Sequence, residues 1–387
     1  MACSGIACSS TGSAGPASRP GSDRRTTMKV GIVGGGVFGL AAAWRLAVRG
    51  HAVSVLEADT IPAQKAASRD VSKALRAGYG ACSATYAPAV GRARELWREL
   101  EAATGRSIYH ETGCIQICSR FEPGGFEYDG YRELERLGWP VTWLEANEVE
   151  RRFPAFAMDG LRGGAFDPNA GWVDPMEALP AFADAARAHG ADIRERTPVE
   201  EVHALESDVR LVCAGAWLPR LVPDLGLAIR TTRQHEAMYR PAALGDLAAL
   251  PAWSIDMATE GWYGFPPTAD GLVKVARHVP DADDDPDGDR APVADQAEAV
   301  RGFVEHHLPA LTNAPDEGRS CFYTMSPDGS FLFDAVPGHE DLFAAGCGGG
   351  HAFKFGPMLG EWAADLVEGR PVPEAFRIRG KGRDRVV

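Results

Sequence analysis

Three glycines near the start of the chain constrain its fold more than any other feature. Gly34, Gly36 and Gly39 have the spacing G-x-G-x-x-G, directly after an apolar strand predicted over residues 29–34 and at the mouth of a helix predicted over residues 38–48. Glycines in this context permit a tight turn and let backbone amides approach a pyrophosphate at the helix N-terminus. The opening therefore predicts a dinucleotide-binding βαβ unit.

An acidic residue occupies the position where such a unit contacts ribose. A second strand is predicted over residues 52–56, and Glu57 closes it. A carboxylate there accepts hydrogen bonds from a ribose 2′-hydroxyl and disfavours a 2′-phosphate. The motif alone does not separate FAD from NAD. The residues of this unit expected to contact the cofactor are Gly34, Gly36, Val37, Phe38, Gly39 and Glu57.

A second strand, glycine loop and helix near the C-terminus favour FAD. A strand is predicted over residues 342–345, and a helix follows with Leu359, Trp362 and Leu366 on one face. Amides of a glycine loop before that helix would suit the N1/O2 edge of a flavin, which becomes anionic on reduction. A nicotinamide enzyme has no such need. The loop glycines expected at this edge are Gly346, Gly348, Gly349 and Gly350.

Length and charge limit the class of protein. The 387 residues are 45% hydrophobic, enough to bury a large core in one intertwined two-domain enzyme. The net charge of -13, without a basic stripe, argues against nucleic acid as a partner. No apolar run reaches the length of a membrane span, so we expect no membrane partner. The predicted fold class is α/β, with a helix over residues 175–189 capped by Asp174.

Several segments are expected to lie outside the site. Residues 1–27 are rich in Ser, Gly and Ala, and we expect a disordered or mis-started extension. The sparse cysteines indicate neither a disulfide framework nor a metal site, and the cytoplasm is the expected compartment. Cys114 and Cys118 are expected to fill the core. Strands are expected to dominate residues 199–275, and the Asp-rich run 280–292 is expected to be a solvated loop.

Longer motifs carry a family resemblance. The chain from residue 29 to about 375 resembles the D-amino-acid-oxidase superfamily, and within it the monomeric sarcosine oxidase family with its N-methyltryptophan, pipecolate and fructosyl-amine oxidase relatives. The resemblance implies bound FAD, in a Rossmann-type domain interleaved with an antiparallel β-sheet substrate domain. The motifs that carry it are GIVGGGVFGLAAAWRLAVRGH, SKALRAGYG, CAGAW, WYGFPPTADGLVKVARH, SCFYTMSPDGSFLFD and GCGGGHAFKFGPMLG.

Cys321 matches the position at which the resembling enzymes attach their flavin through a thioether. Tyr323, Thr324, Pro327 and Asp328 match the surrounding context, so the resemblance implies covalent FAD. By its residue type alone, a strand cysteine is more often a buried structural residue. The resemblance also implies further cofactor contacts from Ser72, Val199, His351 and Lys354.

A lysine on a predicted strand is the main catalytic candidate. Alternation places Leu272, Lys274, Ala276 and His278 on one face. By pattern alone Lys274 could be a snorkelling surface lysine. The resemblance implies a lysine over the flavin that promotes its reaction with molecular oxygen. It also implies active-site roles for His278 and for Tyr263, which could equally be an ordinary strand tyrosine.

Two cations match the pair that binds the substrate carboxylate in the resembling enzymes, namely Arg76 and Lys354. A desolvated anion needs cationic partners, and a guanidinium can bind it in a bidentate manner. A surface position remains an alternative for each. Lys73 departs from the arginine of sarcosine oxidases and is similar to the lysine of the fructosyl-amine branch, which puts simple sarcosine in doubt as the substrate. Residues 202–209 are also shorter than the family pattern.

These observations predict an FAD-dependent oxidase that acts on the C–N bond of a small N-substituted amino acid and passes electrons to oxygen. A D-amino-acid dehydrogenase with another acceptor and a non-catalytic FAD-binding subunit are the alternatives. The cofactor domain is predicted over residues 28–80, 145–225 and 320–375, and the substrate domain over residues 81–144 and 226–319.

Overall fold

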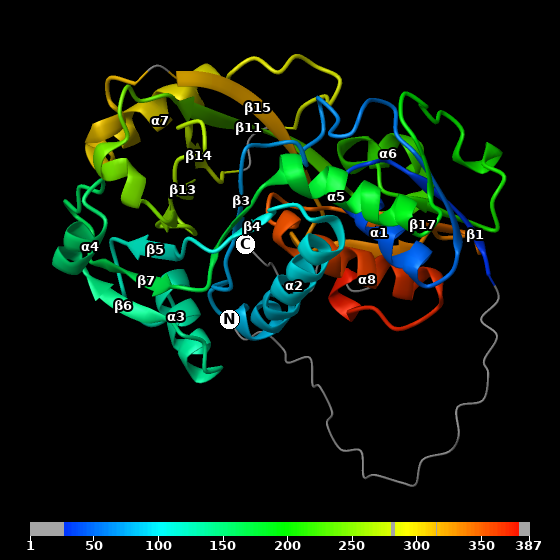
Figure 1. The fold of residues 1–387 in the computed structure, drawn as a ribbon, viewed down its shortest axis with the longest axis horizontal. Helices are drawn as coiled ribbons and strands as arrows, with labels where there is room; N and C mark the ends of the chain where they lie inside the picture. The colour runs from blue at the N-terminus through cyan, green and yellow to red at the C-terminus, as the bar shows by residue number, and fades with distance from the viewer. Residues whose placement is uncertain (1–26, 280–282, 315, 379–387) are drawn as a thin grey trace, which may run out of the picture.

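Two β-sheets occupy opposite sides of the molecule (Figure 1). The computed structural model describes residues 27–279, 283–314 and 316–378. Residues 1–26 of the predicted N-terminal extension lie outside this part of the chain, as do three residues of the Asp-rich run. Strands β11 and β15 run from the eight-stranded sheet toward the six-stranded one across the top of the view in Figure 1.

The six-stranded sheet contains the predicted βαβ opening. Its order is β16-β17-β10-β1-β2-β9, parallel except for the edge pair β16 and β17. Helix α1 (Val37–Val48) connects β1 to β2, so the glycine turn lies at the carboxyl end of a central strand, as predicted. The strands are β1 (Lys29–Val33), β2 (Ala52–Leu56), β9 (Asp192–Arg194), β10 (Val209–Val212), β16 (Leu332–Ala335) and β17 (Leu342–Gly346).

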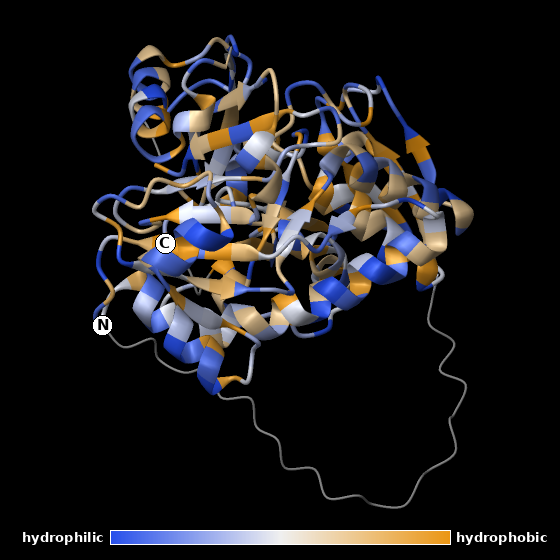
Figure 2. Ribbon diagram, turned by 60° about the vertical axis from the view of Figure 1, so that its left-hand side comes forward, coloured by the Kyte–Doolittle hydropathy of each residue, from blue (hydrophilic) through white to orange (hydrophobic). Residues whose placement is uncertain are grey.

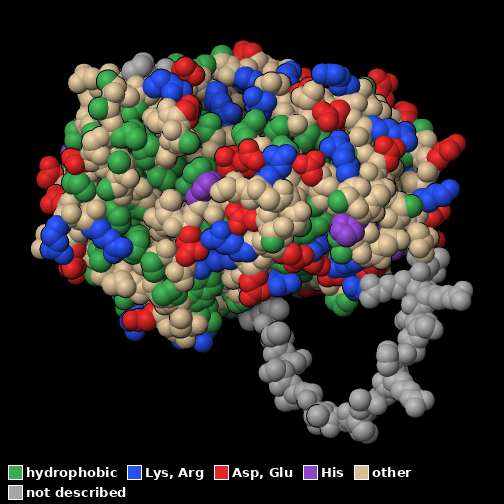
Figure 3. Space-filling model, in the orientation of Figure 1, with side chains coloured by type: hydrophobic (Ala, Val, Ile, Leu, Met, Phe, Trp, Pro, Cys, Tyr) green, Lys and Arg blue, Asp and Glu red, His purple; other side chains and the backbone are tan. Residues whose placement is uncertain are grey.

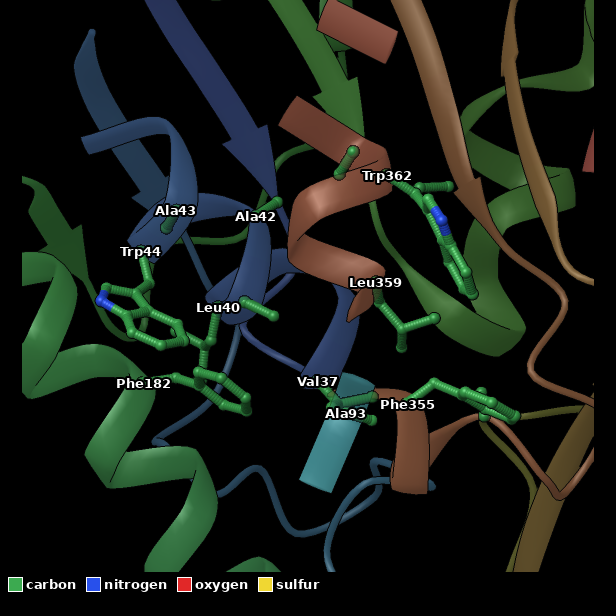
Figure 4. Packing of buried hydrophobic residues seen from close by; sticks show 14 of the residues in the cluster. Val37, Leu40, Ala42, Ala43, Trp44, Ala93, Phe182, Phe355, Leu359 and Trp362 are labelled. Carbon is green, nitrogen blue, oxygen red and sulfur yellow. The ribbon is translucent and has the colours of Figure 1, made fainter. Parts of the chain in front are cut away.

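Helix α1 packs against helix α8 (Gly356–Val367) in the largest apolar cluster, together with α2 (Ser83–Thr104) and α5 (Pro175–Ala188). A glycine makes the α1–α8 approach possible, since a Cβ at Gly360 would lie 2.4 Å from the Ala41 carbonyl oxygen. Figure 4 shows α8 beside α1, with the Trp362 ring on the side of α8 that is turned away from α1. This packing fixes the N-terminus of α1 relative to the C-terminal glycine loop.

The eight-stranded sheet has the order β15-β11-β14-β13-β12-β5-β7-β6. It is antiparallel except for the pair β5 and β12, which is parallel and corrects the expectation of a wholly antiparallel sheet. Cys114 and Cys118 are buried in β5, as predicted. The strands are β5 (Cys114–Cys118), β6 (Thr142–Glu145), β7 (Gly163–Asp167), β11 (Arg230–Tyr239), β12 (Ala252–Ile255), β13 (Trp262–Gly264), β14 (Val273–Arg277) and β15 (Asp316–Met325).

The remaining elements are short or peripheral. The Asp174 carboxylate accepts hydrogen bonds from the Met176 and Glu177 amides at the start of α5, which confirms the predicted cap. Three strands form a small third sheet, namely β3 (Lys73–Leu75), β4 (Tyr109–His110) and β8 (Gly171–Val173). The other helices are α3 (Phe126–Arg136), α4 (Ala146–Arg152), α6 (Leu218–Leu221) and α7 (Ala294–His307). The 3-10 turns are η1 (Val202–Ala204), η2 (Gly215–Trp217), η3 (Pro223–Leu225), η4 (Gly245–Ala249), η5 (Pro309–Leu311), η6 (Phe353–Phe355) and η7 (Glu374–Phe376).

The predicted domain bounds stay a prediction, although several elements, α4 among them, pack differently from them. Helix α2 packs in the core beside α1 and α8, whereas β7 and the end of β15 belong to the eight-stranded sheet. Residues 199–229 form mainly short helical turns with the single strand β10, so the expected run of strands begins only at β11. Alternation of apolar residues indicates a strand but not the sheet that it joins.

The hydropathy of the chain follows the layers, with apolar residues on the strands and on the inner faces of the helices (Figure 2). On the face in Figure 3, basic and acidic side chains alternate without a basic stripe, in line with the acidic composition. Among the described residues no helix combines the length and apolarity needed to cross a bilayer.

Candidate functional site

A cavity of about 640 Å³ lies at the carboxyl ends of the parallel strands of the six-stranded sheet. Loops after β1, β2, β10 and β17 line it, and β15 forms another wall. The crevice outside the carboxyl ends of parallel strands is the usual ligand site of such sheets, and its volume lies in the range of small-molecule sites. The sequence-predicted residues in its wall are Gly34, Gly36, Val37, Phe38, Glu57, Lys73, Val199, Cys321, Gly348, Gly349 and Gly350.

The N-terminal glycines leave room that side chains would fill. Gly34 has φ of +106°, and a Cβ there would lie 2.5 Å from the Cys213 carbonyl oxygen. A Cβ at Gly39 would lie 1.9 Å from the Gly34 carbonyl oxygen. Gly39 therefore packs the turn against the helix and does not itself line the cavity. The turn fits a cofactor whose phosphates approach backbone amides at a helix N-terminus.

Two side chains hold this turn in place. The Gly35 N–H donates to Glu57 Oε2 (2.6 Å) and the Asp59 N–H donates to Glu57 Oε1 (2.9 Å). The carboxylate is thus oriented at the cavity wall and retains lone pairs for a ribose hydroxyl. Ser68 Oγ accepts from the Val37 N–H (3.0 Å), a cap that the sequence did not predict.

The C-terminal glycine loop forms the opposite end of the cavity beside Cys321. Gly349 and Gly350 have φ of +53° and +75°. A Cβ at Gly350 would lie 2.4 Å from the Tyr323 ring, so only glycine lets this tyrosine approach the loop. The turn η6 separates the loop from α8, so the N-terminus of α8 does not follow the glycines directly as expected. Burial raises the pKa of the Cys321 thiol to about 12.

About half of the described residues of the Asp-rich run are exposed, but the run is not merely a solvated loop, and its Pro286 is buried. Asp287 lines the larger cavity, accepts from Trp217 Nε1 (2.8 Å) and pairs with Arg220. Its backbone carbonyl accepts from Lys65 Nζ (3.2 Å). Other aspartates of the run pair with Arg230 and Arg233 on β11. The absence of apolar periodicity predicted the exposure but gave no sign of these partners.

A second cavity, of about 70 Å³, adjoins the first. The two share the lining residues Lys73, Tyr323, Gly350 and Phe353. The smaller cavity is large enough for roughly five water-sized groups, which suits a small molecule. The sequence-predicted residues in its wall are Ser72, Lys73, Arg76, Tyr263, Lys274, His278, Gly350, His351 and Lys354. Ser72 and His351, predicted to contact the cofactor, thus line the smaller cavity and not the larger one.

The register of the eight-stranded sheet explains this gathering. Ser254 of β12 lies opposite Gln116 of β5 and Tyr263 of β13. Tyr263 lies opposite Ala276, which pairs with Glu236 of β11. Because side chains two positions apart share a face, Lys274 and Ser254 are on the same side of the sheet as this row. A single sheet face thus supplies one part of the polar wall, and the segments around β3 and after β17 supply most of the rest.

A buried cluster of charges stands behind the junction of the two cavities. Lys274, only 1% exposed, contacts Asp70 and donates to Glu236 Oε1 (2.7 Å). Asp70 also pairs with Lys73 Nζ (2.7 Å) and with Arg319 Nη2 (2.8 Å), and Arg319 pairs with Glu236 (2.7 Å). The inward orientation predicted for Lys274 is confirmed, whereas its two carboxylate partners were not predicted.

The charges of this cluster stabilise one another. Burial alone would lower the pKa of Lys274, but the carboxylates of Asp70 and Glu236 outweigh it and raise this pKa above its usual value. Burial would raise the pKa of Asp70, and Lys274, Lys73 and Arg319 instead hold it well below its usual range. The cluster therefore stays ionised at neutral pH, with three cations around two carboxylates.

Arg76 and Lys354 are brought together as predicted, but with different partners. Lys354 Nζ donates to the Tyr79 hydroxyl (2.8 Å) and to the His351 carbonyl oxygen (3.0 Å), and Arg76 donates to the Gly78 carbonyl oxygen. Over the described ranges neither cation pairs with a carboxylate. Burial, and then the Arg76 charge, lower the pKa of Lys354 well below its usual value. Such a pair favours an anionic ligand.

Aromatic and imidazole groups complete the wall. His278 Nδ1 lies 3.4 Å from the Tyr323 hydroxyl, and a side-chain hydrogen bond links Tyr323 to Tyr263. Burial, together with the Arg76 and Lys354 charges, lowers the pKa of His278 to about 4. His278 is therefore neutral at pH 7 and can accept or donate one hydrogen bond.

The sequence did not single out several residues of the site. Tyr323 was read only as part of the context of Cys321, although it lies between the two cavities. Asp70 lies three residues before Lys73 in a segment without strand or helix signals, so no periodicity predicted that it is buried. The alternation of polar residues along β11, with Gln234 and Glu236 on one face, is the signal that would have indicated a polar wall.

Comparison with known proteins gives a consistent result. Residues 29–366 match the family model described as DAO, FAD dependent oxidoreductase. The chain is 26% identical over 356 residues to a monomeric sarcosine oxidase of Arthrobacter sp., covering 87% of this chain and 91% of that protein. It is 26% identical over 363 residues to an N-methyl-L-tryptophan oxidase of Yersinia pestis, covering 88% and 95%. The solved structure of NikD, described as an unusual amino acid oxidase essential for nikkomycin biosynthesis, is similar with a TM-score of 0.76 at 25% identity, covering 90% and 96%.

Proposed function

Because the chain belongs to the DAO family of FAD dependent oxidoreductases, we propose that it is an oxidase of the C–N bond of a small N-substituted amino acid. The amine is oxidised to an imine, which water hydrolyses to an amine and a carbonyl compound. Molecular oxygen takes up the two electrons and two protons and becomes hydrogen peroxide. The relatives named for oxidation of sarcosine and of N-methyltryptophan support the substrate class.

One observation carries the proposal, namely that the two cavities share Lys73, Tyr323, Gly350 and Phe353. A small molecule in the smaller cavity would lie next to whatever fills the Cys321 end of the larger one. FAD, when bound there, supplies the acceptor for a hydride equivalent. We infer that the glycine turn and Glu57 hold its adenosine half and that the Gly348–Gly350 loop holds its flavin half. Cys321 is the residue placed to bond it covalently.

We infer that Arg76 and Lys354 bind the substrate carboxylate. An anion that leaves water for the 70 Å³ cavity needs charge-assisted partners, and these two cations lack carboxylate partners in the described structure. Neutral His278 and the Tyr263 hydroxyl remain to orient the amine. The aromatic rings of Phe126, Phe265 and Phe353 exclude water around it.

Lys274 is the residue that we propose promotes the reaction of the reduced flavin with oxygen. A fixed cation stabilises the negative charge that develops when oxygen accepts an electron. The ion pairs with Asp70 and Glu236 offset much of that charge, and this observation favours a second candidate, a dehydrogenase that passes electrons to another acceptor. One positive charge of the cluster nevertheless remains in excess, so the oxidase is the function that we favour.

A peroxide assay on the purified flavoprotein tests the proposal. N-methyl, cyclic and fructosyl amino acids form the substrate panel, and the matching amines without a carboxylate form the control. We expect peroxide from at least one amino acid and about 10- to 100-fold less activity, as kcat/KM, in Arg76→Ala. Anaerobic bleaching of the flavin without peroxide in air would favour the dehydrogenase. Absence of bleaching with every amine would contradict both.

A further inference from the structure

Two serine hydroxyls in the wall of the smaller cavity have no hydrogen-bond partner among the residues that the structure describes. Ser254 is 2% exposed and Ser72 is 1% exposed, and both line this cavity. The Oγ atoms of both residues are buried and unpaired. Leaving a buried hydroxyl unsatisfied costs about 1–3 kcal/mol, so such groups usually have a partner. The cations in the same wall, by contrast, already donate to oxygen atoms of the protein.

Ser254 has both polar and apolar neighbours. Across the sheet it lies opposite Gln116 and Tyr263, and the next position along β12 on the same face is Ala252. Ala252 and Phe265 belong to an apolar cluster against which Tyr263 and Ala74 pack. Ser254 is thus a hydrogen-bonding group at the edge of the apolar part of the wall. Ser72 reaches the same cavity from the segment that precedes β3.

We propose that Ser254 is a specificity-determining residue that hydrogen-bonds a hydroxyl group on the nitrogen substituent of the substrate, with Ser72 as a second contact. The inference rests on the proposed function and narrows its substrate class to hydroxyalkyl amino acids. A hydroxyl both donates and accepts, as does serine, so it satisfies Ser254 whichever way the serine proton points. The carbon chain that carries it fits against Phe265, which lines the cavity.

A bare N-methyl substrate fits the wall less well. It would leave both serine hydroxyls unsatisfied, and a site built to bind a hydroxyl discriminates strongly against the analogue that lacks it. The substrate carboxylate is not the expected partner of Ser254. Arg76 and Lys354 supply charged donors for that group, whereas Ser254 lies on the sheet opposite Tyr263 and Gln116.

Two acids that differ in one group test the inference by binding alone. (2-Hydroxyethoxy)acetate and propoxyacetate have the same chain length, and both carry an ether oxygen in place of the amine, so neither can form an imine. Their dissociation constants are measured by calorimetry on the flavin-loaded protein, on Ser254→Ala and on Ser254→Thr. We expect the hydroxy acid to bind the natural protein about 10-fold more tightly. The preference should fall to about 1-fold in Ser254→Ala and persist in Ser254→Thr.

The outcomes separate this inference from the function on which it rests. If both acids bind the natural protein equally well, Ser254 does not recognise the hydroxyl group of the substituent. The inference is then overturned, whereas the proposed carboxylate site is still supported. The same holds if Ser254→Ala keeps the preference or weakens both acids alike. If neither acid binds, Arg76 and Lys354 do not form a carboxylate site, and the inference about Ser254 is overturned as well. Thermal melting of both variants checks that each is folded as the natural protein.

Discussion

The two cavities of this protein are built in different ways. The larger one is formed mainly by backbone, at turns where glycines remove side chains and a helix N-terminus is left open. The smaller one is formed by side chains from one face of the eight-stranded sheet and from the segment around β3, with buried cations and carboxylates behind it. The first therefore selects a ligand by its shape. The second is a set of charges and hydroxyls that selects a ligand by its chemistry.

The difference has an energetic consequence. A backbone-built site depends on steric room, so a single added methyl group can abolish it. A site built from charges depends on mutual compensation, so removal of one partner leaves its neighbours desolvated and unpaired. We therefore expect substitutions in the larger cavity to cause loss of the cofactor. Substitutions in the smaller cavity should instead reduce stability or ligand selectivity.

The largest effect is expected for Gly39→Ala. The added Cβ would lie 1.9 Å from the Gly34 carbonyl oxygen, so the turn and α1 cannot both keep their positions. We expect the purified variant to retain no flavin, as measured by its visible absorbance. Gly302→Ala is the matched control in helix α7, because nothing lies within 4 Å of its Cβ. It should keep the flavin and gain up to about 1 kcal/mol of stability. Full flavin content in Gly39→Ala would contradict a backbone-built site.

Asp70→Asn should lower the free energy of unfolding by about 3 kcal/mol, because three cations would lose their shared carboxylate. The pKa of Asp70 is held below its unfolded value, so its contribution is present above about pH 4 and is lost as the pH falls. Urea denaturation at several pH values measures both effects. Glu95→Gln, which breaks an exposed pair with Arg92, should cost under about 1 kcal/mol. Equal losses for both variants would refute the buried cluster.

Lys274→Met should slow the reaction with oxygen roughly 10- to 100-fold. Methionine keeps the apolar stem and deletes the charge, and substrate oxidation develops no comparable negative charge on an external molecule. Stopped-flow absorbance separates the anaerobic half-reaction, which should change only a few-fold, from reoxidation. If the rate of reoxidation is unchanged, Lys274 has a structural role or contacts the substrate, and Lys73→Met is the variant to compare next.

The smallest effect, about 10-fold in affinity, is expected for Lys354→Met. Burial lowers the pKa of Lys354 and a bound carboxylate raises it again, so binding is coupled to proton uptake and acids should bind more tightly as the pH falls toward the pKa of the free protein. Calorimetry of propoxyacetate in two buffers of different ionisation enthalpy measures the proton uptake. The natural protein should take up a proton on binding, and Lys354→Met should not. If the natural protein takes up no proton on binding, Lys354 does not bind the carboxylate.

The same difference explains how far the sequence predicted each cavity. Gly34, Glu57 and the Gly348–Gly350 loop follow strands directly, and local patterns of this kind predicted both ends of the larger cavity. Glu236 meets Lys274 through the pairing of β11 with β14, and Asp70 reaches the same lysine from the distant segment before β3. No local pattern encodes such a contact. Strand alternation placed Lys274 on one face with Ala276 and His278, and the family resemblance indicated that it faces inward, whereas its carboxylate partners depend on tertiary structure.

A crystal structure of the flavoprotein with bound propoxyacetate tests the central claim most directly, because the claim is that the adjoining cavities hold cofactor and substrate. We predict FAD in the larger cavity with density joining it to Cys321 Sγ. We also predict the acid in the smaller cavity, with its carboxylate on Arg76 and Lys354 and its propyl chain against Phe265. A carboxylate on Lys73 or Lys274, or an acid bound outside the smaller cavity, would contradict the account.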